Sequence, residues 1–344
     1  LNPLVMIAML LIGYRAIGMV VVTTIFNVVT LLINYWYCKK RLKIQVRFGH
    51  FQWGFFKEVS VYSFWIFLNA IMDRIYWSTG QFVLGMFKGA AVVAVYAVAI
   101  QLQAIYMGFS TAISGVFLPK VTAMVTKENN EKAISDLFIR TGRIQYIIIA
   151  FILTGFVVFG KSFIRLWAGS DYEDAYGITL CFFIPMTVPL IQNLGIIILQ
   201  ARNQMKFRST LYVVIAFVSL VISIPLSKQY GGIGCAISIA LALTTGQIIV
   251  MNIYYHRVIH IDILDFWKEI GKMSLVPFAI GSLSFYLFCI YEIHTVQIFI
   301  VCIFAFSCIY VPLFWFFGMN AYEKELFVLS LIHISEPTRR TPIS

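Results

Sequence analysis

Charged residues are scarce in this sequence: they make up 12% of the 344 residues, whereas hydrophobic residues make up 60%. The mean hydropathy is correspondingly high, at +0.87. A chain with so little charge cannot cover one or two soluble domains with a polar surface. The composition therefore excludes a soluble globular protein and predicts an all-α, polytopic membrane protein.

Acidic residues are the rarer charge, with 15 against 26 basic residues and a formal net charge of +11. Such an excess can indicate binding to nucleic acid. Here, however, the Lys and Arg residues cluster in alternate loops between apolar runs, as the positive-inside rule for membrane proteins requires. We therefore expect the lipid bilayer and no nucleic acid as a partner, with the basic loops and the C-terminus on the cytoplasmic side.

The sequence also lacks the usual signatures of an enzyme or of a metal site. No carboxylates are paired at catalytic spacing, no glycine-rich loop is suited to phosphates, and the six cysteines lack metal-ligand spacing. We interpret the cysteines as buried free thiols. The sequence predicts no enzymatic activity, no metal and no cofactor, and leaves open a coupling ion, H⁺ or Na⁺.

Both ends of the chain have unusual features. Leu1 stands where an initiator Met is expected, and no charged leader precedes the first apolar run, so we expect an N-terminal part to be missing. Near the other end, LSLIHISEPTRR resembles a translated sequencing adapter. We expect residues 328–344 to be a non-native tail that packs poorly or not at all.

Apolar runs long enough to cross a bilayer, which takes roughly 20 residues, recur along the rest of the chain. We predict about nine complete transmembrane helices, preceded by one partial helix at residues 1–13. The complete spans are predicted at residues 16–38, 59–86, 90–117, 144–159, 175–200, 210–226, 233–255, 273–291 and 296–317. Pro185 and Pro189 lie inside one of these spans, where we expect a broken helix.

The second complete span carries charge at membrane depth, because Asn69, Asp73 and Arg74 lie near its middle. Each such charge costs roughly 2.5 to 3.5 kcal/mol on insertion scales and by default indicates a function. Asp73 is the only carboxylate that we place inside a span, and Arg74 the only buried cation. On a helix, Asn69 and Asp73 share one face, and Trp77 and Gln81 continue that stripe.

Two interpretations of this stripe remain open. In the first, the stripe lines a substrate cavity in which the guanidinium of Arg74 bonds a phosphate through two donors. In the second, Asp73 and Arg74 form a structural ion pair, or the polar groups hold another helix.

Other polar residues stand near predicted breaks and loop ends. Gln192, Asn193 and Gln200 follow the proline break, where unwound backbone lines a cavity in many transporters; plain hydrogen bonding between helices is the alternative. Arg143 and Gln145 stand where a basic loop enters the membrane. We interpret Arg143 as an anchor whose side chain snorkels to the cytoplasmic interface.

Two predicted spans that run in the same direction share a pattern of residues. Tyr14 and Gly18 in the first align with Tyr230 and Gly234 in the second. Same-direction repeats are typical of transporters built from two parallel halves. The alternative is chance similarity between two apolar helices of biased composition.

Six stretches of the sequence together carry a recognisable family pattern. They are SFWIFLNAIMDRI, LGMFKGAAVVAVYAVA, STAISGVFLPKVT, LFIRTGRIQ, PLIQNLGIIILQARNQMKFRS and YGGIGCAIS. With them the chain resembles, from residue 1 to about residue 327, the oligosaccharide flippases of the multidrug/oligosaccharidyl-lipid/polysaccharide exporter superfamily. Proteins of this kind are often called polysaccharide biosynthesis proteins.

This resemblance implies two six-helix lobes around a central cavity that opens alternately inward and outward. Residues 1–47 would be the end of the first lobe, residues 48–258 the second six-helix lobe, and residues 259–327 an accessory transmembrane hairpin. The tail at residues 328–344 has no counterpart.

The resemblance also implies a function. We expect transport of an oligosaccharide linked to undecaprenyl diphosphate across the bacterial cytoplasmic membrane, with other polysaccharide-assembly proteins as possible partners. The candidate substrate-binding residues are Asn69, Asp73, Arg74, Trp77, Gln81, Gln192 and Asn193. A multidrug exporter of the same fold is the alternative. A polymerase or acyltransferase is disfavoured, because it is expected to carry a long outer loop or an interfacial pair of His and carboxylate.

Overall fold

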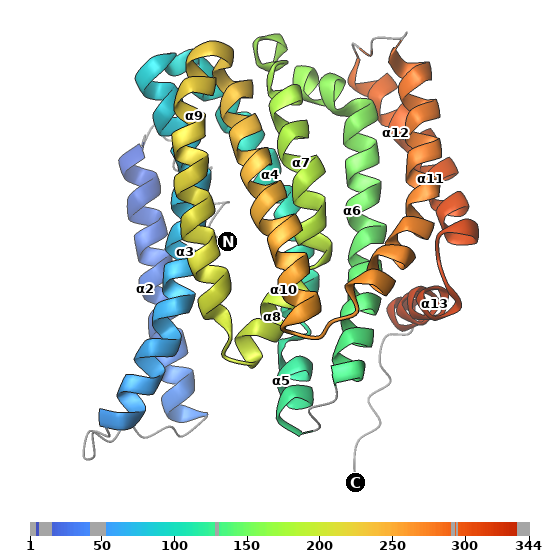
Figure 1. The fold of residues 1–344 in the computed structure, drawn as a ribbon. Coiled ribbons are helices and arrows are strands. Elements are labelled where there is room, and N and C mark those ends of the chain that lie inside the picture. The colour runs from blue at the N-terminus through green and yellow to red at the C-terminus, as the bar shows by residue number, and fades with distance from the viewer. Residues whose placement is uncertain are drawn as a thin grey trace. The chain divides into compact units, whose positions relative to one another are not determined.

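The structure is a computed structural model that describes residues 5–6, 16–41, 53–127, 131–289, 293 and 295–335, with side chains near the C-terminus described up to Val328. Within these residues every regular element is a helix (Figure 1), which confirms the predicted all-α class. The longer helices are α2 (Ala16–Lys40), α3 (Trp53–Phe87), α4 (Ala90–Gly115), α6 (Glu131–Trp167), α7 (Ala175–Ile191), α9 (Met205–Ala242), α11 (Ile263–Cys289) and α12 (Val296–Phe317). The shorter ones are α5 (Leu118–Lys127), η1 (Ser170–Tyr172), α8 (Leu194–Ala201), η2 (Leu243–Val250), α10 (Met251–Arg257) and α13 (Ala321–Ser335).

The chain divides into two compact units, Leu1–Ser60 and Val61–Ser344. The first unit contains α2, whose last turns place Lys39 and Lys40 over the rings of Tyr35 and Trp36, at 5.9 and 4.9 Å. Aromatic and basic residues of this kind suit the interface between membrane and water. The predicted partial helix at residues 1–13 lies almost wholly outside the described residues, as do residues 42–52.

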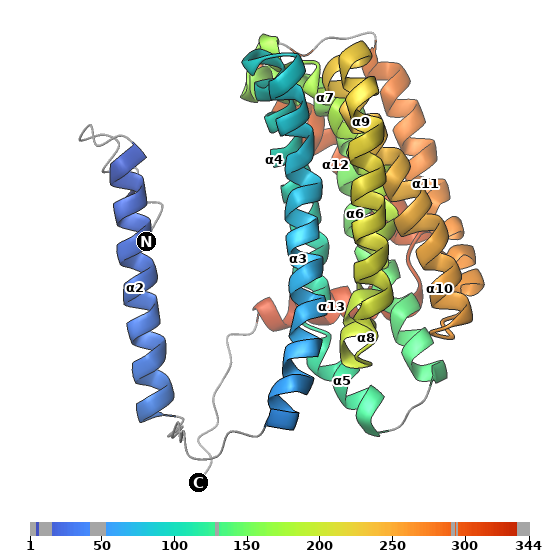
Figure 2. The ribbon, with the colours of Figure 1, turned by 60° about the vertical axis from the view of Figure 1, so that its left-hand side comes forward.

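The second unit is a bundle of upright helices. α4, α6 and α7 stand next to one another, and α11 packs along α6 on the side away from α4 (Figure 1). α3 stands beside α9, which Figure 2 shows from another side. Tyr96, Leu84 and Phe182 fill the space between α3, α4 and α7 and are fully buried. Aromatic and branched apolar side chains therefore form the core, as expected of helices that are apolar on more than one face.

A glycine turn folds α9 back on itself. The helix rises from Met205, reverses near Gly231 and descends towards α10 (Figure 1). Gly231 has φ 61° and ψ −134°, a conformation that side-chain-bearing residues avoid. At Gly234 an added Cβ would collide with the backbone of Leu226 on the other arm. The YGGIG stretch thus makes the tight connection between the spans predicted at residues 210–226 and 233–255.

The expected broken helix is present. α7 ends at Ile191, α8 begins at Leu194, and the two axes differ by 46°. Pro185 and Pro189 precede the break, and each removes one backbone N–H from the helical ladder. The break places Gln192 and Asn193 at the corner between the two helices.

Several helices extend beyond the apolar windows that predicted them. α6 covers Glu131–Trp167, although the apolar run is residues 144–159, and α11 begins at Ile263 rather than at residue 273. A helix continues past its apolar stretch because its backbone hydrogen bonds do not depend on the polarity of its side chains. Charged residues that the sequence assigns to loops therefore lie on helix ends.

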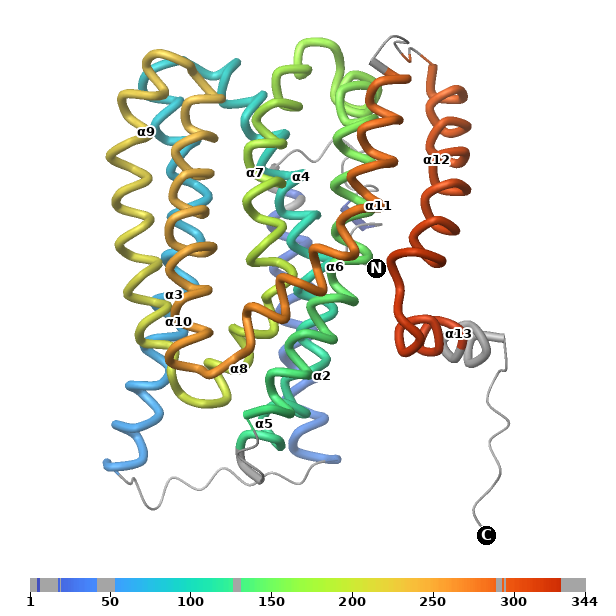
Figure 3. Tube along the Cα trace, turned by 45° about the vertical axis from the view of Figure 1, so that its right-hand side comes forward, coloured from blue at the N-terminus to red at the C-terminus, as the bar shows by residue number. Residues whose placement is uncertain are grey.

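α13 was not predicted. It lies across the lower end of the bundle, whereas α11 and α12 stand upright (Figure 3). Its backbone continues to Ser335 and so includes the start of the expected non-native tail. The side chains of residues 329–344, and the backbone from residue 336, lie outside the described residues, so the expectation of poor packing stays a prediction.

Among the described residues, six helices are long and apolar enough to cross a membrane, or seven if the bent pair α7 and α8 is one span. This supports a multi-pass membrane protein. The stretch Met205–Arg257 counts once in this number although it reverses at Gly231, and α3 is not among the six. The count of about nine spans therefore stays a prediction.

The described cysteines are free thiols, but not all are buried. Cys235 lies in the core, whereas Cys308 is exposed on α12. The expectation of uniformly buried thiols is thus wrong, because apolar helices have one face turned away from the bundle. Cys289 lies outside the residues whose side chains are described.

Candidate functional site

A polar pocket of about 220 Å³ lies inside the second unit, bounded by α3, α4, α7, α8, α9 and η2. Four of the residues that the sequence singled out line it, namely Asn69, Asp73, Trp77 and Asn193. The rest of the lining is Met107, Thr111, Met186, Pro189, Leu190, Ile196, Arg208, Tyr212, Leu243 and Gln247. The shared face of α3 therefore points into the bundle, where it meets polar groups from α9 and η2.

Arg208 is the cation of this pocket. Its side chain is only 6% exposed, and its Nη1 donates to Oδ1 of Asn69 at 2.5 Å. The guanidinium lies 5.0 Å from the centre of the Tyr212 ring, and the Tyr212 hydroxyl donates to Oδ1 of Asp73 at 3.2 Å. Polar contacts thus join α3 to α9 at two successive turns.

Arg208 precedes the span predicted at residues 210–226, so the sequence prediction placed it in a basic loop, and this loop position is wrong. α9 begins at Met205, so Arg208 lies in its first turn and its long side chain reaches into the bundle. Arg143 is also buried, so the expectation that Arg74 is the only buried cation is wrong as well.

Arg74 does not line the polar pocket, and its side chain is exposed. Consecutive helix residues are separated by about 100°, so a residue next to Asp73 points away from the face that holds Asp73. Among the described ion pairs none joins Asp73 to Arg74, which argues against the structural pair. Gln81 is half-buried two turns beyond Asp73 and lies outside the lining.

Gln192 joins helices and does not line the pocket. It is 2% exposed, and its Nε2 donates to Oδ1 of Asn252 at 2.9 Å while Nδ2 of Asn252 donates back at 3.3 Å. Nε1 of Trp267 donates to the same Asn252 oxygen at 3.0 Å. The interpretation as hydrogen bonding between helices fits this geometry, because the contacts tie the α7 break to α10 and α11.

Asn193 and Gln145 meet at Ser110 on α4. The Nδ2 of Asn193, which lines the pocket, donates to the Ser110 hydroxyl at 3.3 Å. The fully buried Gln145 donates to the Ser110 carbonyl at 3.2 Å and to the Ser114 hydroxyl at 2.5 Å. These contacts tie the corner between α7 and α8 to α4 and α6. Gln200, at the far end of α8, is outside the lining.

Arg143 does not snorkel to the interface. It is 5% exposed and donates to two carboxylates, through Nε to Glu323 at 2.6 Å and through Nη1 to Glu269 at 2.6 Å. Glu323 lies on α13, a helix that the sequence did not predict. The snorkelling interpretation is wrong because the guanidinium of Arg143 bonds to carboxylates of neighbouring helices and not to water at the membrane surface. Glu323, which is 1% exposed, is also a buried carboxylate, so Asp73 is not the only one that helices enclose.

The polar pocket contains donors without partners. Among the described residues, Nε of Arg208 and Nε2 of Gln247 are buried and make no hydrogen bond within the protein. Both side chains are at least nine-tenths buried, at 6% and 5% exposed. Nε1 of Trp77, whose side chain is half-buried in the same lining, is a third buried donor without a partner among the described residues. Buried donors are almost always satisfied, so three unsatisfied donors in one cavity indicate a place for a bound polar group.

Sequence reasoning missed Gln247 as well as Arg208. Gln247 lies on η2, a π-helical segment, and such segments occur often at functional sites. Its signal in the sequence was a single amide inside an apolar span, which is weak because Gln also joins helices in membranes.

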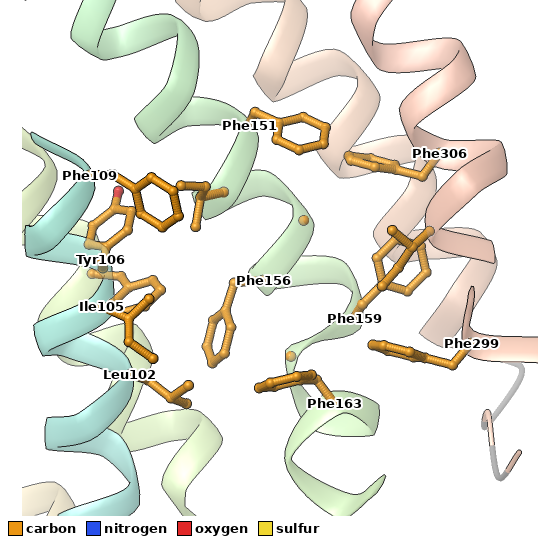
Figure 4. Close-up of a pocket in the computed structure, with 15 residues that line it drawn as sticks. Leu102, Ile105, Tyr106, Phe109, Phe151, Phe156, Phe159, Phe163, Phe299 and Phe306 are labelled. Carbon is orange, nitrogen blue, oxygen red and sulfur yellow. The ribbon is translucent and has the colours of Figure 1, made fainter. Parts of the chain in front are cut away.

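A second cavity differs in character. It has a volume of about 260 Å³ and lies between α4, α6 and α12, with Phe183 of α7 at its edge. Figure 4 shows the rings of Phe156, Phe159 and Phe163 from α6 and of Phe299 and Phe306 from α12 around it. With Tyr106 as its only hydroxyl-bearing residue, this cavity offers little to bind a polar ligand.

These observations define an all-helical, multi-pass membrane protein with a polar pocket enclosed by apolar helices. Residues 2–177, about half of the chain, match the profile of the polysaccharide biosynthesis protein family, and the chain belongs to that family. Comparisons with curated proteins and with solved structures find no match. The protein thus has a role in polysaccharide biosynthesis.

Proposed function

We propose that this protein moves an oligosaccharide linked to undecaprenyl diphosphate across the bacterial cytoplasmic membrane by alternating access. The family and the multi-pass fold support a membrane step of polysaccharide biosynthesis. The observation that carries the proposal is the polar pocket, in which Arg208 and Asp73 face one cavity within a bundle of apolar helices.

The physical problem of such a step is the polar headgroup. The lipid tail stays in the hydrocarbon throughout, whereas sugars and phosphates lose their water and need replacement hydrogen bonds. Buried charges inside a membrane are costly and are kept where they serve a substrate path. Asn69, Asp73, Arg208 and Gln247 offer both donors and acceptors for that purpose.

The charge distribution supports an orientation. α5, α13 and the beginnings of α9 and α11 lie at the lower end of the bundle in Figure 1. These segments carry Lys120, Lys324, Lys206 and Lys272. The positive-inside rule favours the cytoplasm for this end, and the position of α13 at the same end supports a cytoplasmic C-terminal part. We expect transport without a covalent step, coupled to H⁺ or Na⁺ and assisted by other polysaccharide-assembly proteins.

The test is transport by the full-length protein in proteoliposomes. A fluorescent sugar linked to polyprenyl diphosphate is placed in the inner leaflet, and its arrival outside is followed with an added glycosidase. Arg208→Gln is expected to abolish arrival. Arg74→Gln is the matched control, because it removes a cation next to Asp73 on α3 that does not line the pocket. Transport by this variant is expected to stay near the wild-type rate.

Two outcomes contradict the proposal. Export of a cationic dye without arrival of the labelled glycolipid would indicate a multidrug exporter. A covalently altered glycolipid, seen by mass spectrometry, would indicate an enzyme.

A further inference from the structure

We infer that the polar pocket recognises a single neutral sugar ring of the glycan and not the diphosphate. This inference rests on the proposed function and assigns one part of the substrate to the pocket. It is carried by the size, the charge, the free donors and the apolar wall of the cavity.

The size of the pocket limits what it holds. Its volume of about 220 Å³ is below the range of about 300–1,000 Å³ that encloses drug-sized ligands. An oligosaccharide with its lipid diphosphate is larger than such ligands, so only a fragment of it enters. One sugar ring or one phosphate group matches the space.

The charges decide between these two fragments. Arg208 and Asp73 line the same pocket with opposite formal charges. An anion drawn to Arg208 would face the Asp73 carboxylate across a small cavity of low dielectric, where repulsion is strong. A sugar hydroxyl avoids this conflict, because it can donate to the carboxylate and accept from the guanidinium at once.

The free donors fit the same ligand. Nε of Arg208 and Nε2 of Gln247 lack hydrogen-bond partners in the part of the chain that the structure describes, and they belong to different helices, α9 and η2. Oδ1 of Asp73 accepts a hydrogen bond from the Tyr212 hydroxyl, and the carboxylate has further lone pairs that can accept hydrogen bonds. A ring with several hydroxyls satisfies donors and acceptors that are arranged around it.

The remaining wall is apolar. Met107, Met186, Leu190, Ile196 and Leu243 line the pocket together with the charged groups. A pyranose ring has a face of C–H groups that packs against such a surface, with its hydroxyls directed at the polar groups. A phosphate has no apolar face and would lose solvation there without gain.

The experiment measures binding to the full-length protein in nanodiscs by saturation-transfer NMR. The probes are methyl glycosides of glucose, galactose and N-acetylglucosamine, the methyl glycoside of glucuronic acid, and inorganic pyrophosphate. At least one neutral glycoside is expected to bind, and pyrophosphate is not. Asp73→Asn and Arg208→Gln are each expected to weaken the neutral glycoside about tenfold or more, whereas Arg74→Gln leaves it unchanged.

Gln247→Met provides a variant with little risk to folding. The Gln247 amide nitrogen makes no hydrogen bond among the described residues. Replacing Gln247 with Met, which has a similar volume, therefore leaves no acceptor without its donor. Loss of glycoside binding in this variant, at wild-type unfolding temperature, supports the sugar site. Unchanged binding would overturn it.

Pyrophosphate binding by the wild-type protein separates sugar from phosphate. If the pocket held the diphosphate, pyrophosphate would bind the wild-type protein and Arg208→Gln would abolish that binding, and this result overturns the inference. Pyrophosphate binding that appears only in Asp73→Asn supports the inference, because it shows that the carboxylate excludes anions from the wild-type pocket. Transport of the labelled glycolipid by the same preparation tests the proposed function separately. Normal transport together with pyrophosphate binding would refute the sugar site alone, whereas absent transport with glycoside binding would refute the flippase alone.

Discussion

Arg143 and Glu323 are 180 residues apart in the sequence and form a two-pronged ion pair. Nε and Nη2 of Arg143 donate to the two oxygens of Glu323 at 2.6 and 3.0 Å. Glu323 in turn accepts from the backbone N–H of Asn320, whose side chain accepts from the N–H of Glu323. One carboxylate therefore both caps α13 and fixes it to α6.

Replacing this carboxylate is expected to destabilise the bundle. Glu323→Gln leaves the buried Arg143 with Glu269 as its remaining acid, so we expect a loss of about 2 kcal/mol. The measurement is the unfolding temperature of the full-length protein in detergent. Glu325→Gln, on the exposed side of the same helix, is the control and is expected to change little. Equal unfolding temperatures for both variants would show that the pair contributes nothing.

Gly231→Ala is expected to strain the turn of α9. The backbone there has φ 61° and ψ −134°, and forcing a side chain into such a region costs on the order of 1–3 kcal/mol. Gly271→Ala is the matched control, because nothing lies within 4 Å of the added Cβ on helix α11. Ala is a better helix former than Gly, so this control is expected to be neutral or stabilising. Thermal unfolding of both variants distinguishes turn strain from a general effect of added methyl groups.

Gln192→Leu is expected to lower stability without changing glycoside binding by the folded protein. The change removes both hydrogen bonds between Gln192 and Asn252, whereas Asn252 keeps its bonds to Trp267 and to the Ile248 carbonyl, so we expect a loss of about 1 kcal/mol. Gln200→Leu, at the half-buried end of α8, is the control. A Gln192 variant with wild-type stability but no glycoside binding would return this residue to a substrate-binding role.

Glu173 provides a pH-dependent contact at the end opposite α13. A hydrogen bond from Arg165 at 2.5 Å, with Lys161 3.6 Å away, holds the pKa of the Glu173 carboxyl below its ordinary value. A lowered pKa stabilises the fold above the unfolded pKa, and this contribution is lost as the pH falls through the folded pKa. The difference in unfolding temperature between wild type and Glu173→Gln should therefore be full at neutral pH and vanish well below about pH 4.

The control for this titration is Asp174→Asn, which removes an exposed carboxylate next to Glu173. A constant difference between wild type and Glu173→Gln across the acid range would contradict the assigned ion pair. High salt is expected to reduce the difference, because the groups are partly exposed.

The helices themselves could be predicted because their causes are local. Apolar runs of membrane length gave α4, α7 with α8, and α12 close to their observed bounds. Pro185 and Pro189 predicted the break, since a missing N–H acts on its own helix. α13 was missed because a short helix with mixed residues gives no periodic signal.

The polar pocket was predicted in part. Helical spacing placed Asn69, Asp73 and Trp77 on one face, and this face does line the pocket. Helical spacing did not predict which residues of other helices these side chains contact. Arg208 lies 139 positions from Asn69, and the two are in contact only because α9 packs on α3.

The amino-acid sequence by itself determined that the chain is an apolar, all-helical, multi-pass protein, because span length and hydropathy are properties of each segment alone. Only the tertiary structure decided which of the neighbours Asp73 and Arg74 faces the interior. In water an apolar face marks the inside, but in a bilayer the surroundings are as apolar as the core. The direction of a polar side chain is then set by the helix that packs against it.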